Sequence, residues 1–251
     1  MAKINFKDKV VLIAGGAKNL GGEISKAVAK LGANVVIHYN SNSSKKDAEE
    51  TVKAVESLGR KAMMIQLDLT NAKNMGILFE EAKKGMGSID VAINTVGMVL
   101  KKPLTETSEE EFDTMSAVNS KSAFFFIQEA GKHLEDNGKI ITIATSLLGA
   151  YTGLYATYAG GKAPVEHYTR AASKEFGARG ISVNSVAPGP MDTPFFYGQE
   201  SPEAVEYHKS ASALGGLTQV EDIVPIITFL ATDGWWITGQ TILANGGYTT
   251  K

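Results

Sequence analysis

The sequence predicts an α/β protein: one doubly wound, parallel, seven-stranded sheet with helices on both faces. Short apolar runs of strand length recur along the 251 residues as continuous stretches, which is typical of parallel strands covered on both faces. Between them lie helix-length stretches with apolar residues three and four positions apart. This alternation indicates right-handed βαβ units. No linker or change of composition divides the chain, so we expect a single domain over residues 1–251.

The expected elements follow one another in strict alternation. The first helical pattern has apolar residues at Ile24, Val28 and Leu31. The expected strands comprise residues 10–14, 35–37, 63–67, 91–94, 140–144, 181–187 and 241–244.

Composition excludes several kinds of site and partner. The chain has no cysteine, which excludes disulfides, thiolate nucleophiles and cysteine-type zinc sites. We expect ordinary surface or half-buried positions for the four histidines and no metal site, because His38, His133, His167 and His208 show no paired ligand spacing. A net charge of -2 without a basic block indicates neither nucleic acid nor an anionic membrane as partner. Without a signal peptide or membrane-length apolar segment, a cytoplasmic location is expected.

A glycine-rich turn, GGAKNLGG over residues 15–22, leads from the first expected strand into a helical pattern. Small residues at such a place allow backbone N–H groups and a helix N-terminus to approach a pyrophosphate. Glycine also ends strands for purely structural reasons. After the first strand of an α/β pattern, however, the turn favours a dinucleotide site and thus a Rossmann-type domain.

The end of the second expected strand indicates which dinucleotide is bound. Folds that select NAD usually present an acid there to the ribose hydroxyls, and this chain has none. Hydroxyl, amide and ammonium groups suit a 2′-phosphate, which an aspartate would repel. We therefore expect NADP(H) in preference to NAD(H). The polar groups of this region are Tyr39, Asn40, Ser41, Asn42 and Ser43, with Lys18 in the glycine turn.

Tyr158 and Lys162 are the candidate catalytic pair. On a helix, residues four apart share one face, so the phenol and the ammonium group can act on one substrate. A free tyrosine has a pKa of about 10, and we expect the Lys162 cation to lower the pKa of Tyr158. In a chain with eight tyrosines, one such pair can arise by chance, so its meaning depends on the surrounding motifs.

These motifs together resemble the classical short-chain dehydrogenase/reductase family, from the glycine turn to residues 245–247, NGG. The family pattern TGxxxGxG is similar to residues 14–21, with Ala14 in place of threonine and Asn19 in place of the middle glycine. Because asparagine tolerates the left-handed backbone conformation better than most residues, we expect the turn to keep its shape.

The remaining family motifs follow in the family's order. The resemblance implies an adenine-side acid at Asp68, a half-matched NNAG motif over residues 94–97 and a PGxxxT loop over residues 188–193 that touches the nicotinamide end. It also implies that Asn119 holds a water and completes a catalytic tetrad, and that Lys162 holds the cofactor ribose. The full expected cofactor site comprises Gly15, Lys18, Asn19, Leu20, Gly21, Tyr39, Asn40, Ser41, Asn42, Ser43, Asp68, Leu69, Asn94, Gly97, Tyr158, Lys162, Pro188, Gly189 and Thr193.

Two hydroxyl groups compete for the role of the family serine. That serine commonly stands thirteen residues before the tyrosine, which indicates Thr145. It is often followed by two small or apolar residues and a glycine, which indicates Ser146. Either hydroxyl can hydrogen-bond a carbonyl oxygen. Spacing slightly favours Thr145, and both residues stay candidates.

The resemblance implies reversible hydride transfer between NADP(H) and a ketone or secondary alcohol, with Tyr158 as the proton donor. The alternatives are a 3-oxoacyl-[acyl-carrier-protein] reductase and a non-catalytic NADP-binding protein. The apolar segments at residues 98–100 and 195–197, with Tyr151 and Tyr155, either line a substrate pocket or pack in the core. A substrate-covering lid is expected at about residues 193–217.

Assembly is expected from the resemblance alone. Family members usually form tetramers through their two long helices, here residues 109–134 and 155–176, with the C-terminal strand at a second contact. A homotetramer is therefore expected, and Trp235 and Trp236 either lie in such an interface or cap the core.

Overall fold

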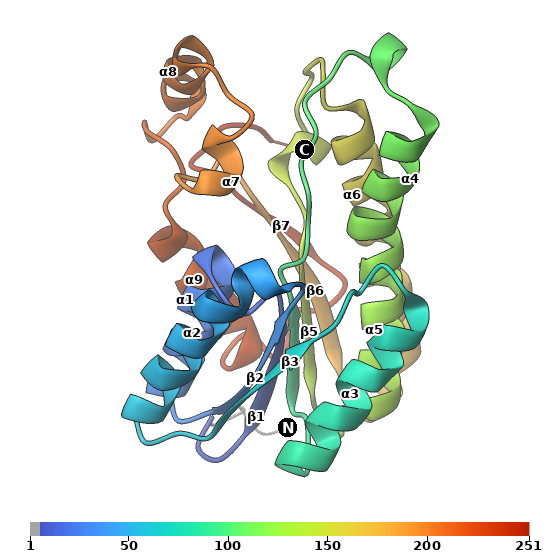
Figure 1. The fold of residues 1–251 in the computed structure, drawn as a ribbon, viewed down its shortest axis with the longest axis vertical. Coiled ribbons are helices and arrows are strands. Elements are labelled where there is room, and N and C mark those ends of the chain that lie inside the picture. Colours follow the sequence, from blue (N-terminus) through green and yellow to red (C-terminus); the bar gives the residue numbers. More distant parts are fainter. Residues whose placement is uncertain (1–5, 251) are drawn as a thin grey trace.

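The computed structural model describes residues 6–250 and contains one sheet of seven parallel strands (Figure 1). The strand order is β3-β2-β1-β4-β5-β6-β7. The chain adds strands on one side of β1 up to β3, then returns and adds β4 to β7 on the other side, so the strand order reverses between β1 and β4. The predicted fold class is confirmed. The strands are β1 (Val10–Ala14), β2 (Asn34–Tyr39), β3 (Ala62–Gln66), β4 (Val91–Asn94), β5 (Lys139–Ile143), β6 (Ser182–Pro188) and β7 (Thr241–Ala244).

Two helical layers cover the sheet (Figure 1). One layer holds α1 (Asn19–Lys30), α2 (Lys45–Ser57) and α9 (Val220–Ala231). The other holds α3 (Ala72–Met86), α5 (Ser122–His133) and α6 (Ala156–Phe176). Alternate side chains of each strand supply the two cores: Val11 and Ile13 pack with the first layer, and Val10 and Leu12 with the second. Burial on both faces explains why the strand sequences are continuous apolar runs.

The predicted helix over residues 109–134 is divided by a turn of π-helix. Its first part, α4 (Glu109–Ser116), starts with a capping box in which Ser108 and Glu111 bond each other's backbone N–H groups. A π-helical turn over Ala117–Lys121 then leads into α5. Turns of this kind occur often at functional sites, and this one contains Asn119.

The segment predicted as a lid contains two short helices, α7 (Pro194–Tyr197) and α8 (Pro202–Ala211). Both lie beyond the carboxyl ends of the strands (Figure 1). Ligands of doubly wound sheets bind at that edge, next to the point where the strand order reverses. Within residues 6–250, every helix is too short or too polar to cross a membrane.

Candidate active site

A cavity of about 540 Å³ brings together most of the predicted site residues. It extends from the glycine turn after β1 to the segment that contains α7 and α8. Five predicted residues lie outside its lining: Ser41, Asn42, Ser43, Asn94 and Asn119. The predicted residues that line the cavity are Gly15, Lys18, Asn19, Leu20, Gly21, Tyr39, Asn40, Asp68, Leu69, Gly97, Thr145, Ser146, Tyr158, Lys162, Pro188, Gly189 and Thr193.

The glycine turn keeps its shape with asparagine at the middle position. Asn19 has φ +48°, so it adopts the left-handed conformation that the sequence predicted for it. Gly15 has φ +76°, and a Cβ on Gly21 would lie 2.1 Å from the carbonyl oxygen of Gly15. Packing within the turn excludes a side chain at Gly21, and the left-handed backbone with Thr95 Oγ1 2.6 Å from the Cβ position excludes one at Gly15.

The N-terminus of α1 faces the cavity and fits a phosphate group. In the described residues no side chain caps this helix at Lys18, and its first turn holds no acid. The first backbone N–H groups of a helix are unpaired within the helix, and the helix dipole favours an anion there. Asn19 and Leu20 line the cavity at this point. The geometry suits a pyrophosphate.

Only part of the predicted region after β2 lines the cavity. Tyr39, Asn40 and the neighbouring Ser44 line the cavity, whereas Ser41 and Ser43 bond each other through their hydroxyls at 2.8 Å. Lys18 Nζ lies 3.0 Å from the Asp47 carboxylate, and both side chains are substantially exposed. The ammonium group thus lies beside the first turn of α2, with the Asp47 carboxylate as its partner.

His38 supports the glycine turn, and its sequence-based interpretation as a surface or half-buried residue is wrong. Its side chain is buried at the end of β2. Nδ1 accepts a hydrogen bond from Gly15 N (3.1 Å), and Nε2 donates to Leu67 O (2.8 Å). Burial lowers the pKa of His38 from 6.5 to about 4, so the imidazole is neutral. Its position just before Tyr39, at the end of a buried strand, was the available signal.

Asp68 and Leu69 follow β3 on the other side of this region. The Asp68 carboxylate accepts hydrogen bonds from the backbone N–H (3.0 Å) and hydroxyl (2.7 Å) of Thr70. These bonds hold the acid at the cavity wall. Leu69 is buried beneath it, so the pair offers one polar and one apolar group to a ligand.

Lys162 is buried beneath the cavity with backbone oxygens as its partners. Its Nζ donates to Val96 O and to Ile143 O, each at 2.9 Å. A Cβ on Gly97 would lie 3.1 Å from this nitrogen, so glycine gives the ammonium group its space. Burial lowers the pKa of Lys162 to about 8. The bend after Asn94 is fixed by its Oδ1, which accepts from Val96 N at 2.9 Å.

Tyr158 retains its proton at neutral pH. Burial raises the pKa of Tyr158 to about 12, and a side-chain hydrogen bond with Thr145 opposes that shift. The net shift of the Tyr158 pKa is therefore upward, opposite to the predicted lowering. The ammonium group is directed to the carbonyls of Val96 and Ile143, and desolvation of the phenolate dominates. A neutral phenol is a proton donor.

The two candidate hydroxyls differ in their partners. The Thr145 side chain acts on the Tyr158 phenol, lowering its pKa against the effect of burial, and its Oγ1 accepts from Leu147 N at 3.3 Å. Ser146 is turned toward the sheet, where its Oγ donates to Ala187 O (2.9 Å) and accepts from Asn245 Nδ2 (3.0 Å). Thr145 is thus placed to orient a carbonyl oxygen beside Tyr158, while Ser146 ties β5 to the segment after β7.

Asn119 is fully buried behind the cavity lining. Its Nδ2 donates to Met98 O (2.8 Å) and Met115 O (3.1 Å), and its Oδ1 accepts from Met98 N (3.1 Å). The same oxygen would lie 3.4 Å from a Cβ on Gly97. Asn119 therefore fixes the backbone after β4 and lies close to Lys162 through Gly97.

The loop after β6 also borders the cavity. A Cβ on Gly189 would lie 2.7 Å from the Thr218 hydroxyl, so this position too excludes a side chain. Thr193 is buried and precedes α7 as its N-cap residue. The loop from Pro188 to Thr193 thereby connects the cofactor side of the cavity to the lid segment.

The predicted substrate-side residues divide into two groups. Met98, Val99, Tyr155, Phe195 and Phe196 line the cavity, and the ring centroids of Tyr158 and Phe195 lie 6.3 Å apart. Leu100, Tyr151 and Tyr197 lie outside its lining.

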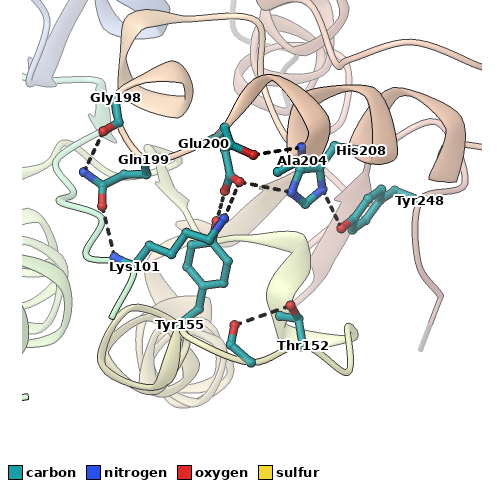
Figure 2. A network of polar contacts seen from close by, with 11 residues as sticks. Lys101, Thr152, Tyr155, Gly198, Gln199, Glu200, Ala204, His208 and Tyr248 are labelled. Atoms are coloured by element: carbon teal, nitrogen blue, oxygen red, sulfur yellow. Dashed lines mark hydrogen bonds and ion pairs between the residues drawn. The ribbon is translucent and has the colours of Figure 1, made fainter. Parts of the chain in front are cut away.

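A buried polar cluster at this end was not predicted. It joins Lys101, Tyr155, Glu200, His208 and Tyr248, and all except Lys101 line the cavity (Figure 2). These residues come from five separate segments, and each alone is an ordinary polar residue. Tyr155 had been named as a substrate-side candidate and His208 only among the histidines, whereas Lys101, Glu200 and Tyr248 had not been singled out. The sequence offered no periodic signal that joins them.

The fold and the site define a class: a dinucleotide-binding oxidoreductase with a tyrosine and a lysine one helical turn apart beneath its cavity. A family model described as "Enoyl-(Acyl carrier protein) reductase" matches residues 15–249. A short-chain type dehydrogenase/reductase of Picea abies is 34% identical over 250 residues, covering 95% of this chain and 92% of that protein. The chain belongs to the short-chain dehydrogenase/reductase family.

Two further similarities bear on chemistry. A hydroxynaphthalene reductase-like protein, Arp2 of Metarhizium brunneum, is 34% identical over 257 residues, which cover 96% of this chain and 95% of that protein. A crystal structure of a putative dehydrogenase from Burkholderia cenocepacia with bound NADP superposes with a TM-score of 0.98. That protein is 64% identical, and the match covers 100% of this chain and 97% of the other.

Proposed function

We propose that this protein is an NADPH-dependent reductase of ketones, which also runs in reverse on secondary alcohols. The observation that supports it most is the joining of two sites in one cavity. The α1 N-terminus and glycine turn form one end, and Tyr158 with Thr145 forms the other. The similarity to a reductase-like protein favours carbonyl reduction as the direction.

NADP(H) is the proposed cofactor. Gly15, Gly21 and the uncapped start of α1 fit its pyrophosphate. Lys18, which lines the cavity as Ser44 does and is paired with Asp47, would supply a cation to its 2′-phosphate. NADP bound to the protein from Burkholderia cenocepacia supports the same choice. When bound, this cofactor supplies a hydride to the carbonyl carbon.

The protein's own side chains then supply the proton. The phenol of Tyr158, protonated because its pKa is about 12, donates to the carbonyl oxygen, which Thr145 holds by a second hydrogen bond. The phenolate that forms would lie one helical turn of α6 from the buried Lys162 cation, whose charge would offset part of the cost of desolvation. The remaining N–H of Lys162 is available to the cofactor ribose, because two of its three hydrogens are bonded to Val96 O and Ile143 O.

The test is the rate of NADPH oxidation across cyclic ketones, diketones, sugars and 3-oxoacyl thioesters, repeated with NADH. Tyr158→Phe removes the acid and should lower kcat about 100- to 10,000-fold while NADPH affinity is retained. Tyr151→Phe, an exposed tyrosine outside the cavity, is the matched control and should behave like the wild type. Full turnover in Tyr158→Phe contradicts the proposal. NADPH binding without turnover on any ketone favours the non-catalytic alternative.

A 3-oxoacyl-[acyl-carrier-protein] reductase is the second candidate. It is favoured by the description of the matching family model, which names an acyl carrier protein. Carrier recognition needs a basic patch against an acidic partner, and Arg179 is bonded to Asp136 instead. Comparing kcat/KM for a carrier-linked 3-oxoacyl group and the same group on a small thiol separates the two candidates.

We also propose assembly into a tetramer through α4, α5 and α6. These helices border a shallow groove that includes Phe112, Phe124 and Tyr168, and the first two are exposed apolar rings. A second copy packed there would remove them from water. Light scattering during gel filtration measures the assembled mass directly.

A further inference from the structure

The polar cluster at the substrate end is organised around one buried carboxylate. The Glu200 side chain, between α7 and α8, is fully buried, and its Oε2 accepts from Lys101 Nζ at 2.5 Å. Its Oε1 accepts the hydroxyl hydrogen of Tyr155. Lys101 lies in the segment after β4, and Tyr155 is the N-cap residue of α6. Glu200 thus joins the lid segment to the main body, with its charge balanced by Lys101 (Figure 2).

His208 extends this cluster to the C-terminal segment. Its Nε2 lies 3.7 Å from Glu200 Oε2, and its Nδ1 lies 2.9 Å from the Tyr248 hydroxyl. Burial lowers the pKa of His208, which favours the neutral ring with a single N–H. A carboxylate oxygen only accepts, so the ring proton belongs on Nε2, and Nδ1 accepts from Tyr248.

The hydroxyl hydrogens of both tyrosines are therefore engaged within the cluster. Tyr155 donates to the carboxylate, and Tyr248 donates to the imidazole that itself faces the carboxylate. A phenol has one hydrogen, so both tyrosines have used their donor. What each can still offer to a ligand is the lone pairs of its oxygen. Both residues line the cavity, and its polar end is consequently an acceptor of hydrogen bonds.

Two neighbouring aromatic residues connect this polar end to the proposed proton donor within one cavity. Phe195 is close to Tyr158, with ring centroids 6.3 Å apart. The next residue, Phe196, lies against His208 with centroids 5.4 Å apart. Two adjacent aromatic rings thus span the wall from Tyr158 to His208. Met98, Val99 and Met191 supply further apolar lining.

We propose that Tyr155 and Tyr248 form a hydrogen-bond-accepting subsite, which selects carbonyl substrates that carry a hydroxyl group remote from the reacting carbon. The apolar wall would hold the carbon skeleton between the two ends. A hydroxyl donates its one hydrogen to either of the two oxygens, whereas a methyl group leaves both without a donor and a methoxy group meets them with an acceptor. The inference rests on the proposed reductase function and narrows its substrate class.

The test uses 3- and 4-substituted cyclohexanones and 5-, 6- and 7-substituted 1-tetralones, each with hydroxyl, methoxy or methyl as the substituent. Their affinities for the NADP-loaded protein are measured by calorimetry, and kcat/KM is measured with NADPH. For at least one ring position, the hydroxyl compound should have an affinity and a kcat/KM tenfold or more above those of its methoxy and methyl analogues. The double variant Tyr155→Phe/Tyr248→Phe should lose that preference, and each single variant should reduce it. Tyr151→Phe should keep it.

The two readouts separate this inference from the function on which it rests. A preference below tenfold at every position in the calorimetric series overturns the subsite, and so does a double variant that keeps the preference. These outcomes hold whether or not any ketone is reduced. If hydroxyl compounds bind preferentially but no carbonyl compound is reduced, the subsite stands and the reductase function fails.

Discussion

The two ends of the cavity are built in different ways. At the cofactor end, backbone geometry makes the site: the start of α1, the left-handed Gly15 and Asn19, and the close approach of Gly21 to Gly15. At the substrate end, side chains from five segments meet around Glu200. Backbone sites depend on short local sequences, while side-chain clusters depend on the completed fold. Changes at the first end should therefore affect every substrate alike, and changes at the second should affect substrates selectively.

The largest effect is expected from Gly21→Ala. The added Cβ would lie 2.1 Å from Gly15 O, so the turn must move. The Kd for NADPH should rise more than 100-fold, which corresponds to about 3 kcal/mol. Gly76→Ala, at a position in α3, is the matched control, because the added Cβ would meet only Glu129 Oε2 at 3.9 Å. Calorimetric titration measures both variants, with circular dichroism as the check of folding. An unchanged Kd in Gly21→Ala would show that the turn is not rigid.

A second effect concerns stability rather than binding and should appear in acid. The pKa of His38 is about 4 in the folded protein, against the ordinary value of 6.5 that we take for the unfolded chain. Between pH 4 and pH 6.5 the unfolded chain therefore binds more protons than the folded protein does. Stability from His38 is complete above pH 6.5 and is lost as pH falls toward 4. The loss amounts to about 3 kcal/mol.

Urea unfolding at pH 7 and pH 4 measures this contribution. His38→Gln keeps an acceptor and a donor without titrating, so it should lose about 3 kcal/mol less than the wild type over that range. His167→Gln, at an exposed position of α6, should lose as much as the wild type. Equal losses in all three proteins would mean that His38 does not stay neutral in the turn.

The smallest effect is expected at the edge of the cofactor end. Lys18 Nζ is half exposed and 3.0 Å from Asp47, so water screens its attraction for a 2′-phosphate. Lys18→Ala should raise the Kd for NADPH about 10-fold and leave that for NADH unchanged. Lys46→Ala, which removes a more exposed lysine paired with Glu50, should change neither. A parallel loss of NADH affinity would place Lys18 on the pyrophosphate instead.

The difference between sites built by local backbone and clusters built by distant side chains also explains what could be predicted from the sequence. Continuous apolar strands, the glycine turn and the Tyr158–Lys162 spacing are local patterns, and the structure places them as one sheet and one cavity. His38 was missed because burial of a polar residue depends on neighbouring strands. The pKa of Tyr158 was predicted in the wrong direction, because spacing along a helix does not show that Lys162 has two carbonyl partners. Glu200 has no local signal at all.

The π-helical turn at Ala117–Lys121 has a consequence for changes of chain length. It places one more residue in a turn than an α-helix would. Deleting a single residue there would give one continuous α-helix in which α5 keeps nearly the same face toward the sheet, because the wide turn already absorbs that residue. The contacts of Asn119 with Met98 depend on the local geometry of the turn and would change. A single-residue deletion in this turn should therefore preserve the fold while it displaces Asn119.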